Sequence, residues 1–301
     1  MSSPLRAIEL NKTFPRVDAL HSLTLEVPEG AVFALVGPNG AGKTTAIKTF
    51  LNLHKPTSGS AEVLGVDSRT LGPAQLAQIG YVSENQKLPG WMTAGDFLAY
   101  CKEFYPTWSS DDLDALVRLY ELPLDRQLKH LSRGMRVKAQ LASSLAYRPK
   151  LIVLDEPFSG LDVLVREQLI ESVLERTPEA SVFLASHDLA EIESFASHIA
   201  YLNEGRLAFA EETAALTARF REIQVTLDSP AGLPAHLPAT WLNPEVSGVV
   251  VGFTDSQFGA GAQAEIRSRF PAAREIAARV MPLRSIVLAL EKSARPGKGA
   301  R

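Results

Sequence analysis

Residues 31–44 read AVFALVGPNGAGKT, and this stretch indicates the architecture of the 301-residue chain. The apolar run over residues 31–36 is typical of a buried strand. Residues 37–44 then fit the phosphate-loop pattern G-x-x-x-x-G-K-[ST] at every fixed position. Residues 45–51 carry apolar side chains at helical spacing. A strand, a glycine loop and a helix in this order predict an α/β nucleotide-binding fold.

The glycine loop is suited to binding phosphate. Glycines let backbone N–H groups approach phosphate oxygens closely, and a helix N-terminus adds a partial positive charge. We expect Lys43 to reach the β- and γ-phosphates of ATP and the Thr44 hydroxyl to bind Mg²⁺. The residues expected to hold the nucleotide in this loop are Gly37, Pro38, Asn39, Gly40, Ala41, Gly42, Lys43, Thr44 and Thr45.

A second segment, LIVLDE at residues 151–156, supplies two acidic side chains. Its four apolar residues predict a central strand, and ligands of open parallel sheets bind at the carboxyl ends of such strands. Asp155 suits a role in holding a water on Mg²⁺. Glu156 suits the general base, a role typically worth ~10²–10⁴ in rate. Two solvated carboxylates at a strand end are the alternative, which the upstream phosphate loop disfavours.

Three further motifs follow in a fixed order. They are LSRGM at residues 131–135, SGLD at residues 159–162, and Ser186-His187-Asp188 after the apolar residues 182–185. Together with the phosphate loop and LIVLDE, they resemble the ATP-binding cassette (ABC) ATPases over about residues 5–212. The resemblance implies a P-loop NTPase fold of ABC type, a mixed sheet core with a helical subdomain. It also implies a catalytic role for Glu156 and Lys43, and γ-phosphate contact for His187.

The resemblance assigns two more parts of the nucleotide site. Phe14 matches the aromatic residue that stacks on adenine, a contact that needs only a π-face. Ser132 and Gly134 match the hydroxyl and glycine of the family's LSGGQ signature. The family geometry would place them against the γ-phosphate held by a second copy, in a homodimer or a heterodimer with a paralogue. Taken alone, LSRGM would indicate an ordinary capped helix without a ligand, and its position ahead of LIVLDE is what favours the signature role.

The chain departs from the family pattern in two places. Arg133 and Met135 replace the glycine and glutamine of LSGGQ, so we expect Arg133 to point away from the nucleotide. Glu84 stands where the family's Q-loop has glutamine. A Glu can still bind Mg²⁺ through oxygen, although it adds negative charge beside a triphosphate. The expected metal ligands are therefore Thr44, Glu84 and Asp155, with Gln86 as a weaker candidate for the Q-loop role.

Composition limits the possible functions. With a net charge of −3, the chain lacks the overall positive potential that attracts nucleic acid. A single cysteine, Cys101, excludes an intramolecular disulfide. No window reaches the ~18 apolar residues needed to cross a bilayer, and no signal-peptide core is visible. We therefore expect an exporter-like ATPase on the cytoplasmic face of the cell membrane, working with a separate membrane permease. The alternative is a soluble ABC ATPase acting in translation, DNA repair or chromosome handling.

We expect two domains. Residues 1–215 would form the ATP-binding domain, with its helical subdomain at about 91–149 and helices beginning near Thr93, Ser110 and Met135. Residues 216–301 would form a small α+β domain, acting in dimer contact, in regulation or only as a cap, with a disordered basic tail at 295–301. Prolines between 230 and 244 oppose regular structure there. The other expected elements are a hairpin at 199–209, strands at 222–227, 249–253 and 275–280, and helices at 256–268 and 283–292.

Residues 85–92, NQKLPGWM, carry apolar side chains where a plain surface loop would be polar. Our hypothesis is that Leu88, Trp91 and Met92 line a groove for a helix of the membrane partner. The alternative is that Trp91 packs into the core of the helical insert.

Overall fold

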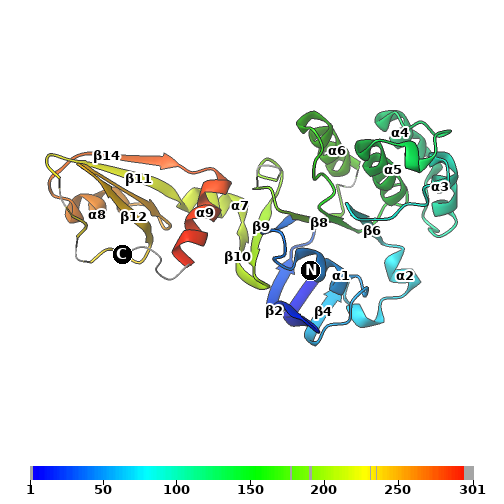
Figure 1. The fold of residues 1–301 in the computed structure, drawn as a ribbon, viewed down its shortest axis with the longest axis horizontal. Coiled ribbons are helices and arrows are strands. Elements are labelled where there is room, and N and C mark those ends of the chain that lie inside the picture. The colour runs from blue at the N-terminus through cyan, green and yellow to red at the C-terminus, as the bar shows by residue number, and fades with distance from the viewer. Residues whose placement is uncertain (1–2, 177, 190–191, 231, 235, 295–301) are drawn as a thin grey trace. The chain divides into compact units, whose positions relative to one another are not determined.

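The computed structural model describes residues 3–176, 178–189, 192–230, 232–234 and 236–294, and it divides the chain into two compact units. The N-terminal unit spans residues 1–210 and the C-terminal unit spans residues 211–301 (Figure 1). The expected tail at 295–301 lies outside the described residues. No helix in the described part of the chain is long and apolar enough to cross a membrane.

The centre of the N-terminal unit is a six-stranded sheet with the order β10-β9-β3-β8-β7-β6. Neighbouring strands from β9 to β6 run parallel, with β3 between β9 and β8. Every residue of β7 is buried, as expected for a strand covered on both faces. The strands are β3 (Val32–Val36), β6 (Ile79–Ser83), β7 (Leu151–Asp155), β8 (Ser181–Ser186), β9 (His198–Asn203) and β10 (Arg206–Glu212). The sequence predictions for β3, β7, β8 and the β9–β10 hairpin are confirmed.

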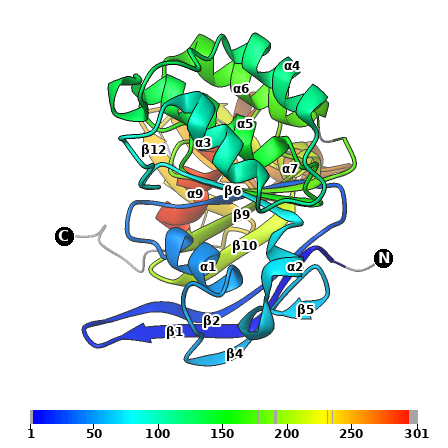
Figure 2. The ribbon, with the colours of Figure 1, turned by 90° about the vertical axis from the view of Figure 1, so that its right-hand side faces the viewer.

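A four-stranded antiparallel sheet with the order β2-β1-β4-β5 accompanies the central sheet. Helix α1 (Lys43–Phe50) lies between the two sheets (Figure 2). Its Ala46, Ile47 and Phe50 are fully buried in one apolar cluster with residues of both sheets. The phosphate loop is therefore anchored to a packed core at both ends. The strands of this sheet are β1 (Leu5–Phe14), β2 (Val17–Val27), β4 (Ser58–Val63) and β5 (Val66–Asp67).

The helices of the insert and α6 gather on the opposite side of the central sheet from α1 (Figures 1 and 2). Ser132 caps α5, because its Oγ accepts from the N–H of Met135 at 3.2 Å. The helix expected near Ser110 does begin there, and its cap is Ser109, whose Oγ accepts from the N–H of Asp112. These helices are α3 (Ala94–Lys102), α4 (Ser110–Tyr120), α5 (Arg133–Leu145) and α6 (Val163–Arg176), while the short α2 (Pro73–Leu76) precedes the insert.

The C-terminal unit is an antiparallel sheet with the order β12-β13-β11-β14. One face packs on α8 through an apolar cluster, in which Trp241 stacks on Phe253 with ring centroids 4.2 Å apart. The other face carries polar side chains and meets α9 near β12. The elements are α7 (Thr213–Arg219), β11 (Arg221–Leu227), β12 (Trp241–Ser247), β13 (Val250–Asp255), α8 (Ala262–Arg269), β14 (Ala273–Val280) and α9 (Leu283–Ala294).

Two expectations for the C-terminal unit were wrong in part. The described residues between 228 and 240 form no helix or strand, as the prolines predict, but β12 contains Pro244. This strand is at the edge of its sheet, its register shifts between Leu242 and Glu245, and Asn243 is left-handed with φ 50°. A proline without an N–H is tolerated at such an irregular edge. The helix expected at 256–268 begins only at Ala262, after Gly261, whose φ of 93° is incompatible with a helix interior.

Candidate functional site

The phosphate loop joins β3, at the middle of the central sheet, to α1. Gly40 and Gly42 hold left-handed φ values of 84° and 108°, which turn the loop around its own backbone. Gly42 is the N-cap of α1 and supplies no side-chain cap, and the first turn of α1 contains no acidic residue. The first N–H groups of α1 are therefore without a side-chain acceptor, which is the arrangement that binds an anion at a helix N-terminus.

Lys43 is only 5% exposed, and its ammonium is enclosed by the loop that precedes it. Its Nζ donates to the carbonyl oxygen of Gly37 at 2.7 Å and to that of Pro38 at 3.2 Å. It also forms an ion pair with Glu156, with 3.1 Å between Nζ and Oε1. The structure therefore joins the phosphate loop and the second acidic segment through one cation.

Asp155 is the last residue of β7, directly before Glu156, and is only 2% exposed. Its Oδ1 accepts from the Thr44 hydroxyl at 2.8 Å and its Oδ2 from the Ser83 hydroxyl at 3.4 Å. Burial raises the pKa of Asp155, and the hydrogen bond from Thr44 lowers it in part. A nearby divalent cation would favour the charged form, so the two adjacent oxygen ligands Thr44 and Asp155 fit Mg²⁺.

Glu156 follows β7 in a left-handed conformation, with φ 53°. This conformation is uncommon for a residue with a side chain and is often found at functional sites. The backbone N–H of Glu156 donates to Ala185 O at 3.0 Å, which fixes the turn against β8. Glu156 Oε2 is 2.7 Å from His187 Nδ1. The Glu156 carboxylate is thus held between Lys43 and His187, at the carboxyl edge of the sheet.

A cavity of about 910 Å³ collects most of the predicted nucleotide residues. Gly37, Pro38 and Asp155 do not line it, but each accepts a hydrogen bond from a residue that does: the first two from Lys43 and Asp155 from Thr44. Lys12 places its ammonium 4.7 Å from the centroid of the Phe14 ring, and His54 meets the ring edge-on. The predicted residues that line this cavity are Phe14, Asn39, Gly40, Ala41, Gly42, Lys43, Thr44, Thr45, Glu84, Glu156 and His187.

Several wall residues were not found from the sequence. Most of them come from the start of β2 and from the turn between β9 and β10 with the first residue of β10, which belong to no nucleotide motif. The only hint in the sequence is that residues 17–21 follow the predicted adenine-stacking residue, Phe14, within a few positions. These residues are Val17, Asp18, Ala19, His21, Glu204, Gly205 and Arg206, together with Asn85 and Ser159.

Ser132 and Gly134 do not line this cavity within the described chain. Ser132 is exposed at the start of α5. Arg133 does not line the cavity either, but its guanidinium forms an ion pair with Glu84, which does. Gln86 lines a separate groove of about 530 Å³ between the segment after β6 and α5. The LSRGM segment, residues 131–135, therefore lies outside the nucleotide pocket of its own chain.

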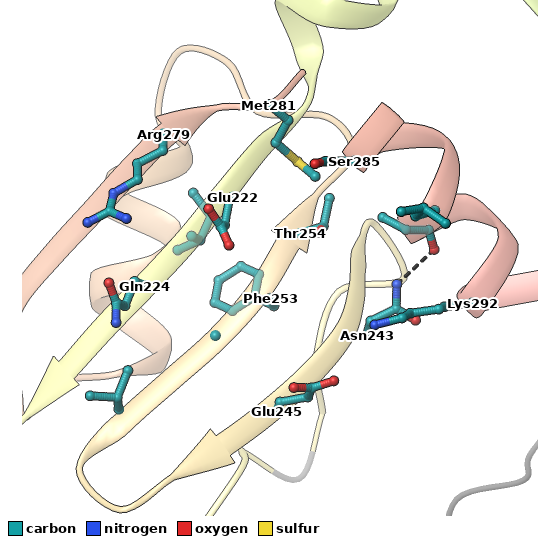
Figure 3. Close-up of a pocket in the computed structure, with 15 residues that line it drawn as sticks. Glu222, Gln224, Asn243, Glu245, Phe253, Thr254, Arg279, Met281, Ser285 and Lys292 are labelled. Carbon is teal, nitrogen blue, oxygen red and sulfur yellow. Dashed lines mark hydrogen bonds between the residues drawn. The ribbon is translucent and has the colours of Figure 1, made fainter. Parts of the chain in front are cut away.

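The polar face of the C-terminal sheet contains another cavity, of about 470 Å³ (Figure 3). Glu222 and Gln224 project from β11 (Figure 3). Gly252 of β13, which pairs with Gln224 in the sheet, also lines the cavity. At one end, Asn243 Nδ2 donates to Ala289 O at 2.7 Å. No group of three or more His, Cys, Asp and Glu side chains suited to a metal was found among the residues that the structure describes. The residues of the predicted nucleotide motifs all lie in the N-terminal unit.

Gly37→Ala should destabilise the N-terminal unit by about 2–4 kcal/mol, because the added Cβ would lie 2.0 Å from the carbonyl oxygen of Leu202. The matched control is Gly40→Ala, where a Cβ meets nothing within 4 Å and only the left-handed backbone opposes it, at about 1–2 kcal/mol. Urea unfolding followed by circular dichroism measures both. Equal midpoints for the two variants would show that the loop is not packed as described.

Comparison with known proteins agrees with this geometry. The family description "ABC transporter" matches residues 20–159. An uncharacterised ABC transporter ATP-binding protein of Nostoc sp. is 34% identical over 64% of this chain and 59% of its own length. The lantibiotic transport ATP-binding protein SrtF of Streptococcus pyogenes is 31% identical over 69% of this chain and 90% of its own. A solved structure described as the ATP-binding subunit of an ABC transporter superimposes with a TM-score of 0.66 at 27% identity, covering 72% of this chain and 92% of that one.

The fold and the site define an ABC-type P-loop NTPase. The chain belongs to the family of ABC transporter ATP-binding proteins. The match spans 59% and 56% of the lengths of two cyanobacterial relatives, less than two thirds of each. Two import ATP-binding proteins occur among the matches beside the lantibiotic transport protein, so the matches do not assign a direction of transport.

Proposed function

We propose that this chain binds and hydrolyses ATP as the ATPase subunit of a membrane ABC transporter. The observation that carries this proposal is the chain of contacts from the phosphate loop through Lys43 and Glu156 to His187. It places a cation, a carboxylate and an imidazole around one point beside the uncapped N-terminus of α1. Phosphoryl transfer depends mainly on such positioning and charge neutralisation.

In this mechanism, Lys43 exchanges its contacts with the Gly37 and Pro38 carbonyl oxygens for the β- and γ-phosphate oxygens of ATP. Glu156 orients a water molecule and takes its proton as the water attacks the γ-phosphate. His187 contacts the γ-phosphate and holds the Glu156 carboxylate. Thr44, Asp155 and Glu84 would hold Mg²⁺, which would supply neutralising charge to the phosphates. Phe14 stacks on the adenine.

We propose that two such subunits close around ATP, as a homodimer or a heterodimer with a paralogue. Ser132 and Gly134 are outside the pocket of their own chain, so a second chain is needed to bring them to the γ-phosphate. Val163 and Leu164, immediately after SGLD, are 55% and 78% exposed at the start of α6. Large apolar side chains at this position are suited to burial against a partner.

A separate integral membrane permease is the second partner, and it would hold the subunit at the cytoplasmic face of the membrane. Trp91 is 71% exposed, so the alternative that it packs into the core of the insert is wrong. Leu88 lines the groove of about 530 Å³ beside α5, whereas Trp91 and Met92 do not. We propose that a helix of the permease enters this groove beside Leu88 and contacts the exposed Trp91.

Purification from detergent-solubilised membranes tests the proposed function. A polytopic membrane protein should co-purify with the chain. The variant Leu88→Ala/Trp91→Ala should lose this partner while keeping its melting temperature and its own ATP turnover. Ribosomes or nucleic acid in place of a membrane protein would instead support a soluble ABC ATPase in translation, repair or chromosome handling.

A further inference from the structure

The two charged departures from the family pattern form an ion pair with each other. Arg133 Nη2 donates to Glu84 Oε1, although the two residues are 49 positions apart. Glu84 immediately follows β6, and Arg133 is the first residue of α5. Where the family has a neutral glutamine and a neutral glycine, this chain has a carboxylate and a guanidinium in contact.

Without Arg133, the negative charge of Glu84 in the pocket would be offset only by Mg²⁺; without Glu84, Arg133 would be an unpaired cation at a helix N-terminus. Glu84 lines the expected phosphate cavity together with Glu156, and a further negative charge beside a triphosphate repels it. Arg133 places a positive charge at a helix N-terminus, where the helix dipole disfavours cations, and the first turn of α5 has no acidic residue. The Glu84 carboxylate supplies negative charge at that helix end, and the Arg133 guanidinium neutralises Glu84.

Backbone contacts fix the position of both members of this ion pair. The N–H of Glu84 donates to Asp155 O at 3.0 Å, which ties the segment after β6 to the end of β7. A Cβ added to Gly160, in SGLD, would lie 3.1 Å from Arg133 Nη1, so the guanidinium occupies the space that a side chain at residue 160 would need. Arg133 therefore packs against SGLD while it reaches Glu84.

We propose that Arg133 is a positioning residue that neutralises Glu84 and so allows a carboxylate to stand in the nucleotide pocket in place of the family's amide. The inference rests on the proposed binding of ATP and assigns a role that LSRGM alone does not indicate. The two side chains are 42% and 31% exposed, so the pair contributes little to folding. Its effect should appear in nucleotide affinity, where the uncompensated charge of Glu84 would act.

A double-mutant cycle tests this role, with binding of the non-hydrolysable analogue AMP-PNP and Mg²⁺ measured by titration calorimetry. Arg133→Ala should weaken binding about tenfold in the native background. In the Glu84→Gln background, where no carboxylate needs neutralising, the same substitution should change affinity by less than about twofold. Arg133→Lys should retain most of the affinity because it keeps the charge.

The matched control is Arg148→Ala, which removes another arginine of the helical insert, one that pairs with Asp112 and lies outside the nucleotide cavity. It should leave affinity unchanged, and the melting temperatures of all variants should agree closely. An equal loss in the native and the Glu84→Gln backgrounds would mean that Arg133 acts on the nucleotide or the fold directly, and would overturn the proposal, as would no loss at all. Failure of the unmodified chain to bind the analogue would instead refute the proposed ATP binding.

Discussion

Glu156→Gln is expected to lower ATP turnover by about 10²–10⁴-fold while leaving ATP binding nearly unchanged. The amide keeps the shape of the side chain and an oxygen that can accept from Lys43, but it cannot take a proton from water. In the structure, the carboxylate is fixed by Lys43 at 3.1 Å and by His187 at 2.7 Å, so the substitution changes chemistry more than position.

Steady-state phosphate release and equilibrium binding of ATP measure the two effects separately. Glu175→Gln provides the control, since Glu175 is exposed on α6 and does not line the nucleotide cavity. It should turn over ATP at the native rate. Undiminished turnover by the Glu156 variant would mean that another group removes the proton, and the assignment of Glu156 would be wrong.

Lys43→Ala is expected to weaken Mg–ATP binding by about two orders of magnitude. Lys43 is 5% exposed, and its ammonium forms three polar contacts. In the proposed complex it would exchange two of them for phosphate oxygens. Its removal also leaves the Glu156 carboxylate without its cation, so the pocket would present more negative charge to the triphosphate.

The matched control is Lys150→Ala. Lys150 immediately precedes the N-terminal end of β7 and is exposed, whereas Glu156 follows the carboxyl end of the same strand. Calorimetric titration with Mg–ATP should show native affinity for the control and a large loss for the Lys43 variant. Equal affinities, with both proteins folded by circular dichroism, would contradict the assigned role of the phosphate loop.

The central sheet was predictable because its signals are local. The run at 31–36, the glycine loop and LIVLDE each lie within one short segment, and the structure places them as expected. The antiparallel sheet was missed although β1 and β2 alternate partly between buried and exposed residues. Their pairing shifts register after Ala7 and again after Leu10, and Glu9 and Ser22 are left-handed. Such irregularities interrupt the period of two on which strand prediction depends.

The nucleotide site also contains some residues that could be predicted from local motifs and others that could not. Residues within a motif, such as Lys43 and Thr44, could be named from the sequence, and the contacts of Lys43 with Glu156 and of Thr44 with Asp155 agree with that expectation. The ion pair of Glu84 with Arg133 could not be predicted, because each residue looked like an isolated departure until folding brought them together. The cavity walls formed by the start of β2 and by the β9–β10 turn also depend on tertiary packing.

The need for a second chain is the central claim, because Ser132 and Gly134 do not line the pocket of their own chain. ATP turnover per chain should be measured over a wide dilution series, with the state of association followed by analytical ultracentrifugation. We predict that turnover per chain falls as the dimer dissociates and approaches zero when only monomer remains. Full turnover per chain in a purely monomeric sample would contradict this account.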